Sequence, residues 1–392
     1  MHERGRGGCG VSCGIGTSET PNRAASPDAA NRSRTLVWLD ARQSVHVSRA
    51  CAAAGLEVVA VGSPTSPGST PHAGEPGLGD VFTGAARVQD LRHSLATLEV
   101  DVAFICTPWP EEGIRAGAQQ SVLDDPAVLS TCRERSIRLL PLEPVPASLA
   151  DYRTMPAPGA APPIEMVPLM VRSPTILGLG DAVSAIGPIR SLFLSVRCGL
   201  GQGTAAARLF DAMSLIHSFL GQPESIDCSV VPPGAASGVH PSPPEFLRAL
   251  RGDVTANLRF SAAQAASLSI SDRAGPWFRG ITLLGDQGCI RMTDDGVEVH
   301  GPDGSPLEVP VSSQSKQPVK PTARTKKSGA SEADTGVRVL SDQIQRALDP
   351  RRPAQPPLDL PQILAMCEAA LLSARTGQNE SPATMLRMNA LG

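Results

Sequence analysis

The feature that most constrains the fold is an alternation of apolar, strand-like runs with helical patterns between residues 34 and 150. Four runs are nearly continuous in apolar residues: RTLVWLD (34–40), LEVVAVGSP (56–64), DVAFICTP (101–108) and IRLLPLEP (137–144). Such runs are typical of parallel strands that are covered on both faces. Because parallel neighbours need crossover helices between them, this part predicts a Rossmann-like, doubly wound parallel sheet.

From about residue 151 the pattern changes to shorter strand-like segments joined by Gly, Asp and Asn turns. These segments fall at 188–199, 225–231, 254–262, 265–272 and 278–304. Short turns between neighbouring strands favour antiparallel pairing. Helical patterns lie at 205–221, 337–349 and 360–376. The second part therefore predicts a C-terminal α+β domain with a mainly antiparallel open sheet, in a chain that is α/β overall.

A chain of 392 residues exceeds the size at which one hydrophobic core keeps growing, so we expect two domains. We place a disordered tail at 1–33, a Rossmann-like, dinucleotide-binding-type domain at 34–150 and the C-terminal domain at 151–392. Residues 312–336 contain few apolar side chains and predict a flexible loop within the second domain. The basic cluster of this loop is interpreted as solvated, with docking to an acidic partner as the alternative.

Composition excludes several classes of protein. The net charge of −3 provides no basic footprint for nucleic acid. No run approaches the roughly 18 apolar residues of a membrane span, and no signal peptide is recognisable. The nine cysteines lack paired spacing, which favours reduced thiols and a cytoplasmic location. Cys9 and Cys13 near His2 allow a metal clip, but an unstructured tail is the preferred interpretation, and no metal site is predicted.

Five stretches, in this order, carry a resemblance to a known family: DVAFICTP, LEPVPASLAD, GPIRSLFLS, GQGTAAARLFDAMSLIHSFLGQP and LLSARTGQN. Together they resemble the Gfo/Idh/MocA family of glucose-fructose oxidoreductases and inositol dehydrogenases, over roughly residues 34–385. The resemblance implies NAD or NADP in the first domain and a sugar-like or polyol substrate in a cleft between the domains. It also implies a homo-oligomer, or a partner for a homologue, since the open sheet of family members often makes subunit contacts.

The predicted cofactor loop departs from the family pattern. Asp40, Arg42 and Val45 stand where the fingerprint has three glycines, which allow a tight turn and a close approach of the pyrophosphate. A carboxylate near the phosphates costs about 1 kcal/mol at high dielectric and about 4 when partly buried. Gly62 and Ser63 replace the acidic residue that would bind the ribose. The candidate cofactor-binding residues are Asp40, Arg42, Ser63, Thr107, Pro108, Trp109 and Pro144.

The positions that would carry proton transfer are also changed. Under the resemblance, Glu143 replaces a lysine and Asp211 replaces the catalytic histidine, so these two are the catalytic candidates. Two carboxylates can share a proton, hold a divalent cation or bind a cationic ligand. The alternative is that both are solvated residues of an idle cleft. A triad of Asp211, Ser214 and His217 is disfavoured, because side chains that project from one helix diverge.

Three functional hypotheses follow from these residues. The first is a divergent Gfo/Idh/MocA-type protein with impaired or lost dehydrogenase activity, which binds a sugar-like or nucleotide ligand or partners an active homologue. The second is an active NAD(P)-dependent oxidoreductase with a non-standard loop, in which Arg42 binds phosphate and Glu143 or Asp211 carries the proton. The third is a non-redox hydrolase or lyase built on the carboxylate pair.

Overall fold

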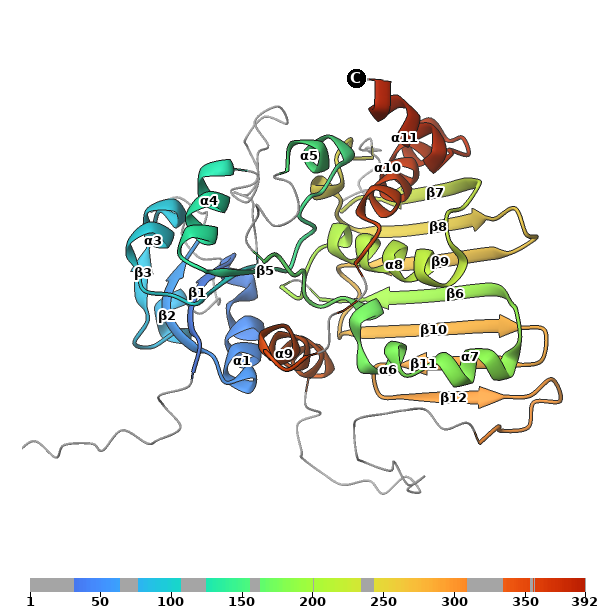
Figure 1. The fold of residues 1–392 in the computed structure, drawn as a ribbon, viewed down its shortest axis with the longest axis horizontal. Coiled ribbons are helices and arrows are strands. Elements are labelled where there is room, and N and C mark those ends of the chain that lie inside the picture. The colour runs from blue at the N-terminus through green and yellow to red at the C-terminus, as the bar shows by residue number, and fades with distance from the viewer. Residues whose placement is uncertain are drawn as a thin grey trace, which may run out of the picture. The chain divides into compact units, whose positions relative to one another are not determined.

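The computed structural model describes residues 32–63, 77–106, 125–155, 163–199, 201–233, 243–308, 334–352, 355 and 357–391. One compact unit extends from Ser33 to Gly392 and contains two sheets (Figure 1). Of the predicted tail only Arg32 and Ser33 are described, and of the predicted loop only residues 334–336. The candidates Thr107, Pro108 and Trp109 lie outside the described residues.

The first sheet is parallel and has the order β3-β2-β1-β4-β5. Its strands are β1 (Arg34–Trp38), β2 (Glu57–Gly62), β3 (Ala86–Val88), β4 (Val102–Ile105) and β5 (Arg138–Pro141). The helices between these strands are α1 (Ser44–Ala54), α2 (Leu78–Val81), α3 (Leu91–Thr97) and α4 (Pro126–Glu134), and α5 (Leu149–Thr154), which follows β5, packs against α10 (Leu360–Thr376). Val37 and Leu36, adjacent on β1, belong to different buried clusters. Both faces of the sheet are therefore covered, and the predicted doubly wound sheet is confirmed.

The second sheet is mainly antiparallel, with the order β12-β11-β10-β6-β9-β8-β7 and one parallel pair, β6 with β9. Its strands are β6 (Ile189–Arg197), β7 (Ser225–Val231), β8 (Asp253–Arg259), β9 (Ala265–Ser271), β10 (Phe278–Gly285), β11 (Cys289–Thr293) and β12 (Gly296–His300). This arrangement confirms the predicted class of the C-terminal part.

Helices α8 (Ala205–Leu220) and α10 (Leu360–Thr376) pack together beside the second sheet, whereas α9 (Thr335–Leu348) packs against α1 (Figure 1). The remaining helices are α6 (Pro174–Leu177), α7 (Gly180–Ile186) and α11 (Pro382–Leu391), and the 3₁₀ turns are η2 (Ala41–Gln43), η4 (Met170–Arg172) and η6 (Leu247–Ala249). The main core cluster lies between helices α8 and α10 and one face of the second sheet. No helix in the described part of the chain is long and apolar enough to cross a bilayer.

Three boundaries differ from those expected. The strand predicted at 137–144 ends at Pro141, which leaves Glu143 in the following turn. The predicted domain boundary at residue 150 falls inside α5, and α9 begins at Thr335, within the predicted loop. Apolar periodicity marks the centre of an element better than its ends, because the ends depend on capping. The division into two domains stays a prediction.

Candidate functional site

The turn after β1, where the dinucleotide fingerprint was expected, is capped by its own side chains. The Oδ1 atom of Asp40 accepts a hydrogen bond of 2.9 Å from the Arg42 backbone N–H, and the backbone N–H of Asp40 donates to Gln43 Oε1 at 3.0 Å. This capping box satisfies backbone donors of the kind that bind phosphate at a helix start. A carboxylate that is only 6% exposed thus takes the place suited to an anionic ligand.

Arg42, the residue expected to bind phosphate in the active-enzyme hypothesis, is held by the same carboxylate. Its Nε atom lies 2.8 Å from Asp40 Oδ1, and 36% of its side chain is exposed. Val45 lies on the exposed side of α1. The two charged residues of the turn therefore neutralise each other.

The glycine-rich loop before α8 presses against this turn. Gly201 has φ of 92°, and a Cβ atom at this position would lie 2.4 Å from the Arg42 carbonyl oxygen. Gln202, next in the loop, donates to the carboxylate of Asp334, which caps α9. The backbone at Gly201 therefore contacts the backbone at Arg42, at the turn that a pyrophosphate would have to approach.

Ser63 and Pro144 occupy the two other described cofactor positions. Ser63 follows β2, and a Cβ on the preceding Gly62 would lie 2.4 Å from the Trp38 ring. Glycine at this strand end is therefore required by the packing of tryptophan, which leaves no room for the usual acidic side chain there. Pro144, which follows Glu143 in the chain, is buried.

Glu143 is buried, with 3% of its surface exposed. Its Oε2 atom accepts a hydrogen bond from the hydroxyl of Thr204, the N-cap of α8, whereas its buried Oε1 has no hydrogen-bond partner among the described residues. Burial raises the pKa of this carboxyl, and Arg251 together with the Thr204 hydrogen bond opposes part of that shift. The alternative of a solvated glutamate is therefore wrong.

Asp211 is fully buried on α8, so the same alternative is wrong for this residue. Its Oδ1 atom accepts a hydrogen bond from the backbone N–H of Met170, and its Oδ2 atom lies 3.5 Å from Nη1 of Arg279. Burial raises the pKa of Asp211, and the nearby guanidiniums of Arg279 and Arg208 oppose the shift. Asp211 is thus a member of an internal ion-pair network.

Arg208 is the central residue of this network, and sequence reasoning did not identify it. Its fully buried guanidinium lies 4.9 Å from the Trp277 ring and 3.9 Å from Asp211 Oδ2. None of its three side-chain nitrogens has a hydrogen-bond partner among the described residues. Trp277 donates to Asp294 at 2.8 Å, and Asp294 also binds Arg279. Trp277 itself is buried between two arginines, Arg208 and Arg279.

The carboxylate pair that motivated the hydrolase hypothesis is not formed. No hydrogen bond joins Glu143 to Asp211 in the described structure, and each is bound to different partners. Among the described residues, no group of three or more His, Cys, Asp or Glu side chains is placed to hold a metal ion. Ser214 donates to the Phe210 carbonyl at 2.7 Å, so its hydroxyl is bonded within its own helix. The geometry gives no support to a triad or a hydrolase.

The two sheets, in these topologies, define an α/β protein of the Gfo/Idh/MocA oxidoreductase architecture. Levoglucosan dehydrogenase, solved with NADH and L-sorbose, has a TM-score of 0.57 at 13% identity, over 90% of this chain and 100% of that one. For myo-inositol 2-dehydrogenase from Lactobacillus plantarum the TM-score is 0.56 at 14% identity, over 89% and 99%. For an oxidoreductase from Agrobacterium radiobacter, solved with NAD⁺, L-tartaric acid and magnesium, it is 0.52 at 16% identity, over 90% and 99%.

No protein-family model matches the sequence, and no curated protein matches it either. The structural likeness confirms the resemblance predicted from the five stretches as far as the fold is concerned.

Proposed function

We propose that this protein is a divergent Gfo/Idh/MocA-type protein in which the dehydrogenase reaction is impaired or lost, and which acts as a ligand-binding or partner subunit. The observation that carries the proposal is the occupied turn at Asp40. Its carboxylate caps the backbone donors, and Gly201 packs directly on the Arg42 carbonyl. A bound pyrophosphate would have to displace an internal anion and a loop, so the described residues do not fit NAD or NADP.

The positions that would transfer a proton support the same proposal. Glu143 and Asp211 are buried, and each accepts a hydrogen bond from a protein group, so neither presents an exposed carboxylate, although Oε1 of Glu143 has no partner among the described residues. Losing a positioned acid or base typically removes a factor of about 10² to 10⁴ in rate. A dehydrogenase would need both of these sites to rearrange.

Calorimetric titration of the full chain with NAD, NADH, NADP and NADPH tests the proposal. We expect no saturable heat with any of the four nucleotides. Saturable binding at micromolar concentration would contradict it. A levoglucosan or inositol dehydrogenase titrated in parallel shows that the conditions detect binding.

A second candidate is an active NAD(P)-dependent oxidoreductase that acts on a sugar or polyol. It is favoured by burial, which raises the pKa values of Glu143 and Asp211, since a raised pKa is a property of carboxyls that act as general acids. This candidate predicts cofactor binding that is lost in Arg42→Ala and kept in Arg49→Ala, an exposed arginine on the following helix, α1. The absence of saturable heat with all four nucleotides would reject this second candidate.

The remaining parts of the proposal concern the surroundings of the protein. A sugar-like ligand is suggested by the sorbose and tartaric acid bound in the similar structures. Self-association, or association with an active homologue, and a cytoplasmic location stay predictions. Sedimentation velocity of the purified chain tests self-association.

A further inference from the structure

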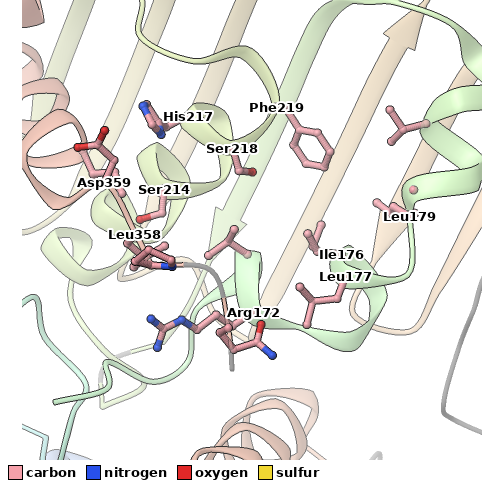
Figure 2. A pocket seen from close by; sticks show the side chains of 16 residues that line it. Arg172, Ile176, Leu177, Leu179, Ser214, His217, Ser218, Phe219, Leu358 and Asp359 are labelled. Carbon is pink, nitrogen blue, oxygen red and sulfur yellow. The ribbon is translucent and has the colours of Figure 1, made fainter. Parts of the chain in front are cut away.

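A cavity of about 490 Å³ lies beside the C-terminal half of α8 (Figure 2). Its walls come from η4, α6, α7, α8 and the chain that leads into α10. None of Asp40, Glu143 and Asp211 lines it. The cavity is therefore separate from the dinucleotide turn and from both catalytic candidates, although Ser214 and His217 line it. Its volume falls in the range of about 300–1,000 Å³ that is usual for small-molecule sites.

Most of the lining is apolar. Phe219, Ile176 and Leu179 lie on one side of the cavity in Figure 2, and Leu358 lies opposite them. These side chains come from three segments of the chain, and Leu179 is buried while the other three are half-buried. Such walls favour a ligand with a hydrocarbon or aromatic part, because its transfer from water contributes about 25 cal/mol per Å² of apolar surface.

One end of the cavity carries positive charge. Arg172 lines it, and its Nη1 lies 3.2 Å from Glu165 Oε1. The same carboxylate binds Arg352 through both oxygens, at 2.6 and 2.7 Å. Two guanidiniums thus share the carboxylate of Glu165, and Asp349 also acts electrostatically on Arg352.

Arg172 also retains a donor for a ligand. Its Nε atom is buried and has no hydrogen-bond partner in the described structure. A buried donor without a partner costs about 1–3 kcal/mol, so an acceptor placed there is favourable. Asp359, at another edge of the cavity, is exposed and accepts from the Gln362 N–H as the N-cap of α10. Its charge is accordingly more screened than that of Arg172.

We propose that this cavity binds a small amphipathic carboxylic acid. The carboxylate pairs with Arg172, and an aryl or alkyl part fills the apolar walls. Guanidinium and carboxylate groups form strong, charge-assisted hydrogen bonds, which fixes the orientation of the ligand. The proposal does not depend on the state of the dinucleotide turn, since the two sites share no residue.

Calorimetry with 4-phenylbutanoate and its neutral amide tests this proposal on the full chain. We expect saturable binding of the acid and binding of the amide that is weaker by at least about tenfold, which corresponds to about 1.4 kcal/mol. In Arg172→Gln the advantage of the acid over the amide should disappear. The matched control, Arg190→Gln, removes an arginine that pairs with Asp286 outside the cavity and should leave the advantage intact.

A second pair of variants tests the location without changing any charge. Gly180 lines the cavity, and a Cβ atom there would meet nothing within 4 Å, so in Gly180→Phe the first atom of the phenylalanine side chain can be added without a clash. We expect this variant to lose binding, whereas Gly296→Phe, at a glycine that is equally open but lies outside the cavity, should keep it. Equal binding of acid and amide, unchanged binding by Gly180→Phe, or no saturable binding to the wild-type chain would each overturn the proposal. The nucleotide titration uses different ligands, so failure of one proposal is distinguishable from failure of the other.

Discussion

The two halves of α8 differ in what their side chains contact. In the N-terminal half, which Thr204 caps, Arg208 and Asp211 face buried protein groups. Asp211 pairs with Arg279, whereas the guanidinium nitrogens of Arg208 have no hydrogen-bond partner among the described residues. In the C-terminal half, Ser214, His217 and Phe219 line an open cavity. The helix thus presents buried charged side chains in its N-terminal half and lines a mainly apolar cavity in its C-terminal half.

The two halves of α8 should therefore differ in whether they can bind a ligand. Charged groups that are bonded internally can bind a ligand only after those bonds break, and a buried ion left without its partner is costly. The cavity needs no such rearrangement. Ligand binding is therefore expected at the C-terminal half of α8, and stability is expected to depend on the N-terminal half.

The largest effect should come from Asp211→Ala, which removes the carboxylate between two buried arginines. We expect the free energy of unfolding to fall by about 3–5 kcal/mol, because a buried charge would lose its counter-ion. Urea unfolding at pH 7 measures it. Asp295→Ala, which breaks an exposed pair with Arg338, should cost less than about 1 kcal/mol. Equal losses in the two variants would show that the network is not buried in solution.

Gly201→Ala tests whether the start of α8 is closed against the turn at Arg42. The residue has φ of 92°, and the added Cβ would lie 2.4 Å from a carbonyl oxygen, so we expect a loss of about 1–3 kcal/mol. Gly296→Ala, where a Cβ meets nothing within 4 Å, is the matched control and should have a small effect. Thermal unfolding of both variants decides the point. A neutral Gly201→Ala would mean that the loop does not press on the turn.

Thr204→Val should be more harmful than Thr204→Ser. Valine removes both the N-cap hydrogen bond to Ala207 N–H and the donor to Glu143, whereas serine can keep both. We expect a loss of about 1–2 kcal/mol for valine and a smaller one for serine. The urea midpoints of the two variants measure the difference. Identical midpoints would show that the Thr204 hydroxyl does not contribute to stability.

The smallest effect concerns the pH dependence of Glu143→Gln. Burial raises the pKa of Glu143 in the folded state, so its contribution to stability is fully present below the unfolded pKa and is lost as pH rises through the folded pKa. The glutamine variant lacks this loss. Relative to wild type it should therefore gain stability as the pH rises from 5 to 8.

Asp211 is present in both proteins of this comparison, so its own titration contributes similarly to each. Urea unfolding of both proteins at the two pH values is the measurement. A stability difference that does not change with pH would contradict the raised pKa.

Much of the fold could be predicted from the sequence. The apolar runs of β1, β2, β4 and β5 identified the parallel sheet, and Gly55, with φ of 75°, ends α1 as expected. These features are local, because the period of apolar residues and the conformational freedom of glycine are properties of short segments. Short elements such as η2, α6 and α7 were missed, since a few residues carry too little pattern.

The candidate site could be predicted only in part. Glu143 and Asp211 were identified by their positions in the family pattern, but their burial and their partners were not. Thr204 lies 61 residues from Glu143, and Arg279 lies 68 residues from Asp211. Contacts at such separations depend on how the sheets and helices pack, which no local pattern reports.

The sequence by itself determined the succession of strands and helices, the class of both sheets and the loss of glycines from the first turn. Only the tertiary structure decided that Asp40 would cap that turn, that Arg208 would be buried against Trp277 and that a cavity would remain beside α8. The physical reason is that propensity and periodicity act between near neighbours, whereas burial and ion pairing depend on which distant surfaces meet.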